Sequence, residues 1–178
     1  MGAVWSEHGT TIIIALLVLP LGGVATYRWR RRTRSAREAL AEVGLLCWTV
    51  PFIGMLFTPQ SAARSIDLVP LHDLPSWFTG GAGTAAAQLV GNLAVLAGVG
   101  FFLPLRFGWA ASLRRVLVLA AGCAVVIETL QWVLAIGRVS SIDDVLINTL
   151  GAVLAAGCSR RWWVSETADN KGQIVPVP

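Results

Sequence analysis

Charged residues are scarce in this chain of 178 residues: 13% of the positions are Asp, Glu, Lys or Arg, whereas 55% are hydrophobic. A soluble domain carries about 25% charged residues, and half that share cannot cover the surface of a soluble globule of this size. The apolar residues also fall in blocks of up to about twenty, not at the spacing of an amphipathic surface helix. The composition therefore predicts a membrane protein with several spans, and the length predicts one domain.

Cysteine is rare and odd in number, which excludes a secreted disulfide scaffold, since Cys47, Cys123 and Cys158 each lie in an apolar block. The sequence also lacks the G-x-S-x-G, H-E-x-x-H and G-x-x-x-x-G-K-S/T patterns of soluble enzymes. The two histidines are far apart in the sequence, so we expect no metal site and no cofactor. The basic residues lie at the ends of the apolar blocks, which argues against nucleic acid as a partner.

The predicted fold class is all-α, a polytopic membrane bundle of five transmembrane helices. The five predicted spans are residues 11–27, 40–57, 85–107, 116–136 and 145–158. The last is shorter than the roughly twenty residues of a full crossing. It spans only if residues 142–144 also lie at membrane depth, and a re-entrant segment is the alternative. Residues 1–62 then hold two N-terminal spans, 63–158 a membrane domain, and 159–178 a cytoplasmic tail that we expect to be disordered.

The arginines are distributed unequally between the loops. Eleven of thirteen follow the first, third and fifth spans, and the remaining two are Arg64 and Arg138. Because Arg and Lys favour the cytoplasmic side, the amino terminus is predicted outside and the carboxyl terminus inside. That parity requires an odd number of crossings and supports the fifth span. Glu42, at the inner mouth of the second span, can snorkel to the interface and is given no role.

Several polar residues lie in the outer halves of spans three, four and five or in the loop between the last two. They are Asn92, Glu128, Gln131, Arg138, Asp143, Asp144 and Asn148. Charged groups at this depth are costly and usually pair or line a cavity, so Glu128 is predicted to pair with Arg138 or Gln131. The set is either a self-satisfied structural cluster or a ligand-binding site, and its size favours a site.

Small residues four positions apart recur in spans three and five, a spacing that lets helices approach closely. The pairs are Ala87 and Gly91, Ala94 and Gly98, Gly151 and Ala155, and Ala152 and Ala156. These two spans are therefore predicted to be the inner helices.

The run from Glu128 to Gly151 resembles the signature of the VanZ-like family of bacterial membrane proteins. That family has an E-x-x-Q pair, a loop with G-R, and a D-D-x-x-x-N-x-x-G run. They match Glu128 and Gln131, Gly137 and Arg138, and Asp143, Asp144, Asn148 and Gly151. Asn92, Gly100 and residues 67–71 resemble further elements, and the resemblance covers roughly residues 63–157. Three departures are Gly98 where Pro is usual, Asp67 for Asn, and Ser141 where a further Asp is common.

The resemblance implies a multi-pass protein of the bacterial cell membrane. Members of the family are associated with reduced sensitivity to teicoplanin, a glycopeptide with a fatty acyl chain that targets lipid-linked cell-wall precursors. A polar pocket between apolar helices suits an amphiphile with a charged head and a lipid tail. Arg138 could hold its phosphate or carboxylate, and Glu128, Asp143 and Asp144 an ammonium or a cation.

Three functions stay open on this reading. A non-enzymatic protein that binds an outer-leaflet amphiphile, an envelope lipid or a lipoglycopeptide, is favoured. A membrane enzyme acting on a lipid-linked precursor would use Glu128 as a base and Arg138 as a stabiliser, but no nucleophile arrangement is recognisable. A transporter or a scaffold of envelope synthesis is the third, although the inner halves of the spans are nearly bare of polar groups. A helix-mediated oligomer or an envelope-enzyme partner is compatible with each.

Overall fold

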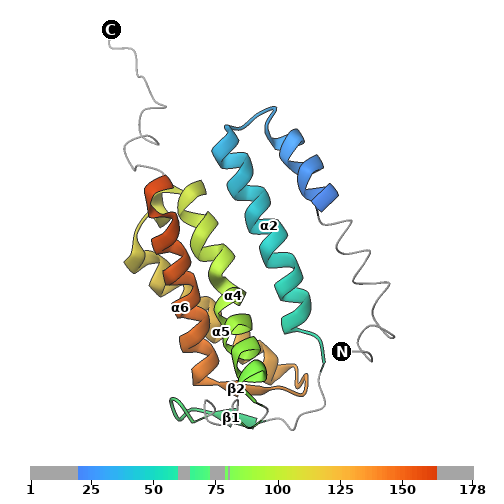
Figure 1. Cartoon of the computed structure of the whole chain (residues 1–178), viewed down its shortest axis with the longest axis vertical. Coiled ribbons are helices and arrows are strands. Elements are labelled where there is room, and N and C mark those ends of the chain that lie inside the picture. The colour runs from blue at the N-terminus through green and yellow to red at the C-terminus, as the bar shows by residue number, and fades with distance from the viewer. Residues whose placement is uncertain (1–19, 60–64, 73–78, 80, 164–178) are drawn as a thin grey trace.

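The computed structural model describes residues 20–59, 65–72, 79 and 81–163. In these parts, long helices run lengthwise and two short strands lie at one end (Figure 1). Most of the first predicted span, 11–27, lies outside the described residues, and its described part is helical as far as residue 30. The predicted tail also lies outside them from residue 164 onward.

Four helices account for the remaining predicted spans. They are α2 (Ala36–Leu56), α4 (Ala82–Arg106), α5 (Leu113–Val133) and α6 (Ile142–Ser159), with the 3-10 turns η1 (Gly108–Ala110) and η2 (Arg160–Trp162). By length and composition each can cross a membrane, α6 together with η2. Only 17–39% of each apolar stretch is buried inside the protein. Most of the apolar side chains therefore face outward, as expected for helices surrounded by lipid. The helical class is confirmed, whereas five crossings and their orientation stay predictions.

The last predicted span gains length at both ends. α6 begins at Ile142, so both aspartates that follow are helical, and η2 extends the apolar helix to Trp162. Ser141 caps the helix, because its hydroxyl accepts the N–H of Asp143 at 3.1 Å. The continuous helix is long enough for a full crossing without a turn back.

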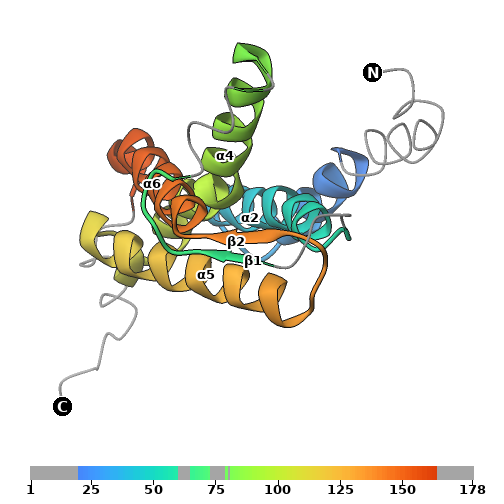
Figure 2. The same ribbon diagram turned by 90° about the horizontal axis from the view of Figure 1, so that it is seen from below.

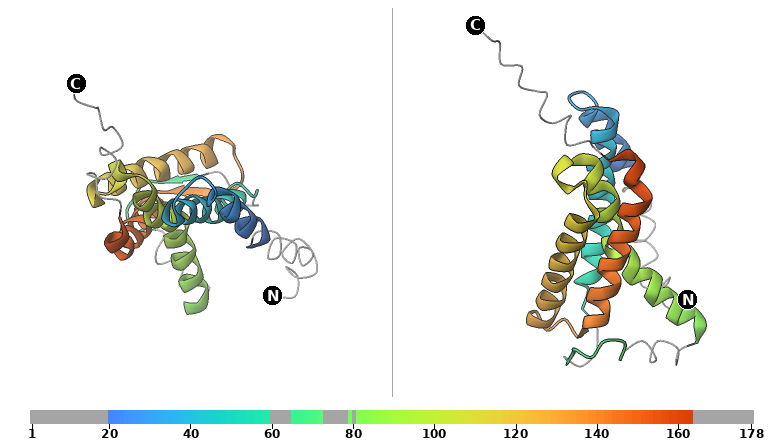
Figure 3. Two further views of the ribbon diagram at one scale, coloured as in Figure 1. Left: turned by 90° about the horizontal axis from the view of Figure 1, so that it is seen from above. Right: turned by 90° about the vertical axis from the view of Figure 1, so that its left-hand side faces the viewer.

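α4 and α6, which the small-residue spacing predicted to be inner helices, pack closely against each other. A Cβ at Gly100 would overlap the backbone of Ala152, and one at Gly151 would overlap the carbonyl of Leu93. Two other glycines behave differently from expectation. Gly98 makes room for the indole of Trp48 on α2, while Gly91 has nothing within 4 Å of its Cβ position. The first turns of α4 lean away from the other helices (Figure 3), and most side chains there are exposed.

Two strands of three residues each, which were not predicted, are added to the mostly helical fold. β1 (Ser65–Asp67) pairs in parallel with β2 (Val139–Ser141), with Ile66 opposite Ser140. Both lie across the helix ends beside α5 (Figure 2). Three residues are too few to show a strand period, and the partner is distant in sequence. We call this the strand end of the bundle, and the opposite one the basic end.

Glu42 joins three helices at the basic end, so its expected lack of a role is wrong. Its carboxylate pairs with Arg30 from the first described helix and accepts the Nε–H of Arg106, at the end of α4, at 2.7 Å. Arg106 also lies 3.5 Å from Glu38. Arg37 donates to the carbonyl oxygens of η2 and Trp163, which ties α2 to the end of α6. The sequence places these charges at the basic end but does not show which of them meet.

Glu42→Gln is expected to lower the free energy of unfolding by about 1–3 kcal/mol, because it leaves two partly buried guanidinium groups without their shared carboxylate. Thermal unfolding in a neutral detergent measures the change. Glu38→Gln is the matched control, since glutamine also completes the capping box with Ser35. Equal unfolding midpoints for Glu42→Gln and the unaltered protein would contradict a stabilising role.

Candidate functional site

The seven polar residues predicted as a site all lie on α4, α5 or α6 or on the connection between α5 and α6. Four of them are buried: Glu128, Gln131, Asp143 and Asn148. The other three are half-buried: Asn92, Arg138 and Asp144. The structure thus places the set within the protein, and the contacts below show which members meet.

Glu128 is buried, with 8% of its surface exposed, and one of its carboxylate oxygens accepts the N–H of Ser141 at 3.2 Å. The hydroxyl of Ser140 donates to the carbonyl of Glu128 at 3.0 Å. The predicted hydrogen-bonded burial is confirmed, but the predicted partners are not, because β2 runs beside α5 and presents its backbone to the carboxylate. Arg138 and Asp144 lie within electrostatic range of Glu128, and no ion pair to it forms among the described residues.

The two aspartates at the start of α6 hold different parts of the chain. The amide of Asn92 on α4 donates to Asp144, which links the two closely packed helices. The backbone N–H of Leu71 donates to Asp143. Leu71 has a positive φ of 63°, uncommon for a leucine, at the end of the segment that contains β1. Residues 65–72, which we call the strap, are therefore fastened to α6 by this bond and to β2 by strand pairing.

Gln131 and Arg138 both bind the end of α2. The Gln131 amide donates to the carbonyl of Leu56 at 3.0 Å, and Arg138 Nη1 donates to that of Met55 at 3.3 Å. The last carbonyls of a helix have no partner within the helix. Gln131 supplies one for Leu56, and Arg138 adds a second bond to the Met55 carbonyl, which also accepts the N–H of Thr58 at 3.4 Å. Within the described parts of the chain, no carboxylate forms an ion pair with Arg138.

Asn148 is the most deeply enclosed member of the set. Only 2% of its surface is exposed, and its side-chain oxygen has no hydrogen-bond partner among the described residues. An unsatisfied buried acceptor costs about 1–3 kcal/mol. Its position one helical turn beyond Asp144 was predicted, but its lack of a partner could not be read from the sequence.

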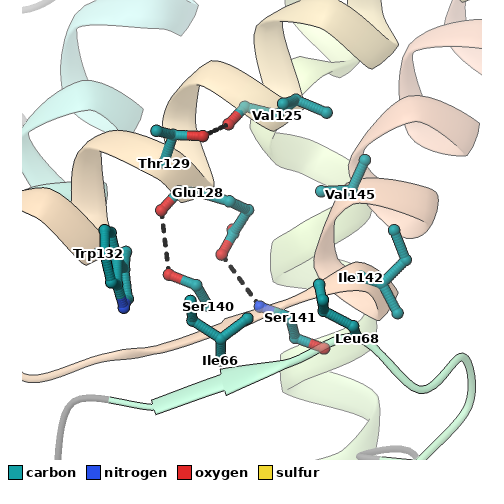
Figure 4. Close-up of a pocket in the computed structure, with 10 residues that line it drawn as sticks. All are labelled: Ile66, Leu68, Val125, Glu128, Thr129, Trp132, Ser140, Ser141, Ile142 and Val145. Atoms are coloured by element: carbon teal, nitrogen blue, oxygen red, sulfur yellow. Dashed lines mark hydrogen bonds between the residues drawn. The ribbon is translucent and has the colours of Figure 1, made fainter.

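Two cavities lie on different faces of α5. The first, which we call the carboxylate cavity, has a volume of about 280 Å³ and lies between α5, α6 and the strap. Its lining consists of Ile66, Leu68, Val125, Glu128, Thr129, Trp132, Ser140, Ser141, Ile142 and Val145. Figure 4 shows Glu128 reaching toward Ser141, with Trp132 on one side and the strap beneath. The wall formed by Ser140 and Ser141 of β2 was not predicted from the sequence. A serine shortly before two aspartates is nevertheless a signal for a helix N-cap at Ser141.

The second cavity, which we call the apolar groove, has a volume of about 530 Å³ and lies between α2, α4 and α5. Its lining is Thr49, Phe52, Ile53, Leu56, Phe57, Val95, Leu96, Val99, Val118, Leu119, Gly122, Cys123, Val126, Ile127 and Leu130. The groove reaches the strand end at Leu56. The carbonyl of Leu56 accepts a hydrogen bond from the Gln131 amide, and the carbonyl of the preceding residue, Met55, accepts one from Arg138. Arg138 thus binds a backbone carbonyl one residue before Leu56, which lines the groove.

The attachment of the strap to Asp143 can be tested by mutation. Asp143→Ala removes the acceptor of the Leu71 N–H and should loosen the strap, so that the buried Ser140 becomes accessible. With Ser140→Cys in a background without the three natural cysteines, we expect labelling by a charged maleimide to become about tenfold faster. Thr149→Ala is the control on α6, because its hydroxyl bonds only within that helix. An unchanged labelling rate in Asp143→Ala would show that strand pairing alone holds the strap.

Within the described residues, no group of three or more His, Cys, Asp or Glu side chains is placed to hold a metal ion. A family model described as VanZ/LLP1 matches residues 43–163, from within α2 to just beyond η2. The match covers more than half of the chain and includes all seven predicted site residues. No curated protein and no solved structure matches the chain.

Proposed function

The chain belongs to the VanZ/LLP1 family, and on that premise we propose that it binds an amphiphile of the outer leaflet of the bacterial cell membrane. The apolar chain of the ligand occupies the apolar groove, and Arg138 holds an anionic group of its head. The observation that carries the proposal is that Leu56 lines this groove directly after Met55, whose carbonyl binds an Arg138 guanidinium group that has no carboxylate partner among the described residues.

The groove supports an apolar ligand by its size and lining. Its volume of about 530 Å³ falls within the range of roughly 300–1,000 Å³ that is usual for small-molecule sites. Thr49 and Cys123 are its least apolar side chains, and the remainder are aliphatic or aromatic or, at Gly122, absent. In a bilayer such a lining suits an acyl or isoprenoid chain better than a soluble metabolite.

Arg138 supports an anionic head. One of its nitrogens donates to the Met55 carbonyl, which fixes the side chain at the end of α2 and leaves further N–H groups of the fork. A guanidinium binds phosphate and carboxylate through two parallel hydrogen bonds. Envelope lipids and acylated glycopeptides both combine a chain with such a group. Lowered sensitivity to teicoplanin-type antibiotics is the finer form of the proposal.

The arginine distribution supports the assignment of the site to the outer leaflet. Arg30, Arg37 and Arg106 lie at the basic end together with the arginines of the η1 and η2 regions. Arginine-rich ends favour the cytoplasm, so the strand end, with Arg138, faces outward in the proposed orientation.

Native mass spectrometry of gently solubilised protein tests the proposal with a pair of glycine variants. Gly122→Phe places a ring in the groove, and Gly157→Phe places one on α6, away from it; neither position has an atom within 4 Å of the Cβ site. We expect Gly122→Phe to retain about tenfold less of a bound amphiphile than Gly157→Phe and the unaltered protein. The same lipids in the same ratio on all three proteins would refute the proposal.

A further inference from the structure

We propose that the carboxylate cavity is a second, separate site, which binds an organic ammonium group carried on a small apolar body. The cavity lies on a different face of α5 from the apolar groove, and no residue lines both. Its charge is opposite to that offered by Arg138, so the two sites take different chemical groups. The inference does not depend on the groove holding an amphiphile.

The charge of the cavity comes from Glu128. Its carboxylate accepts one backbone N–H, and among the described residues no ion pair neutralises it. Two other charged groups lie within electrostatic range, Asp144 with the same sign and Arg138 with the opposite one. Burying a charge without a partner is unfavourable. A cation in the cavity would supply that partner.

The walls favour an organic cation over a metal ion. Apart from Glu128, Thr129 and the two serines of β2, the lining is aliphatic or aromatic. Metal ions such as Ca²⁺ need six or more oxygen ligands. A weakly hydrated organic ammonium group can be bound by one carboxylate and the face of one aromatic ring. Trp132 provides that face beside Glu128 (Figure 4), and tryptophan is the best of the aromatic residues for cations.

The size and position of the cavity limit the ligand further. A volume of about 280 Å³ admits an alkylammonium head with a short apolar group but no long chain. The strap borders the cavity on the side of the strand end through Ile66 and Leu68.

Isothermal titration in an uncharged maltoside detergent tests the site with benzyltrimethylammonium as the probe. Benzyl alcohol and benzenesulfonate keep the ring and remove or reverse the charge. We expect saturable one-to-one binding of the ammonium alone. Glu128→Gln, which keeps an acceptor for the Ser141 N–H, should weaken it about tenfold or more. Glu38→Gln removes the same charge at the basic end and should leave the affinity unchanged.

A second variant covers the case in which Glu128→Gln does not fold. Val125 lines the cavity and is half exposed, so Val125→Phe narrows the cavity and keeps the carboxylate. It too should weaken binding of the ammonium about tenfold. No saturable binding to the unaltered protein, equal binding of benzyl alcohol, or unchanged affinity in a folded Glu128→Gln or Val125→Phe protein would each overturn the inference. None of these results bears on the groove.

Discussion

Gly151→Ala is expected to lower the free energy of unfolding by about 3 kcal/mol or more, since α6 cannot approach α4 with a methyl group at this position. The added Cβ would overlap the carbonyl oxygen of Leu93, which is backbone and cannot rotate away. The two helices must then separate, and the links that depend on their approach, such as Asn92 with Asp144, must lengthen.

Gly157→Ala is the matched control on the same helix. Its Cβ position has no atom within 4 Å, so alanine should be neutral or stabilise the helix by about 0.5–1 kcal/mol through its higher propensity. Gly100→Ala and Gly91→Ala form the corresponding pair on α4, since only Gly100 touches the opposite backbone. Unfolding midpoints of the four proteins in one detergent measure the effect. Similar midpoints for Gly151→Ala and Gly157→Ala would contradict the close approach.

Arg138→Lys is expected to weaken binding of the proposed amphiphile about tenfold to a hundredfold and to abolish any protection of cells against teicoplanin. Lysine keeps the positive charge but loses the planar fork that binds phosphate or carboxylate through two hydrogen bonds. A charge-assisted hydrogen bond is worth about 1.5–3 kcal/mol, which sets the expected loss. Retention of the ligand by purified protein and drug sensitivity of cells that produce it are the two measurements.

Arg114→Lys controls for the loss of an arginine elsewhere, because Arg114 is exposed at the start of α5, at the basic end. Protein abundance and unfolding midpoints must be equal in both variants before their sensitivities are compared. A glycopeptide of the same class without the acyl chain tests the contribution of the tail. Equal protection by Arg138→Lys and the unaltered protein would show that Arg138 does not bind the head group. Equal protection against both drugs would show that the acyl chain is not recognised.

The helices could be predicted because their signals are local. A block of apolar residues, or a pair of small residues at a spacing of four, is contained within one segment of the chain. The small-residue spacing predicted α4 and α6 to be inner helices but did not show that they pack against each other, and Gly100 was noted only as part of the family resemblance. Gly98 was noted where the family usually has Pro, but its contact with Trp48 could not be foreseen. The indole of Trp48 donates to the Ala94 carbonyl at 2.7 Å.

The partners of the polar residues could not be predicted, because they are mostly backbone groups from distant segments. Glu128 accepts the backbone N–H of Ser141, and Asp143 accepts that of Leu71. Gln131 donates to a backbone carbonyl of α2. Every residue has such groups, so the sequence carries no signal for which of them is near. The contact of Asn92 with Asp144, by contrast, joins two side chains of the predicted set. The common depth of the set stays a prediction from counting along the helices, and its contacts could be read only from the fold.

Photo-cross-linking in growing cells tests the central proposal most directly. A benzophenone amino acid at Leu130 lies in the apolar groove, and one at Leu146 lies on the exposed face of α6 near the same end. Mass spectrometry of the adducts should find one chain-bearing molecule with an anionic head at position 130, lost in Arg138→Lys, and mixed bulk lipids at position 146. The same lipid mixture at both positions would contradict a specific amphiphile site.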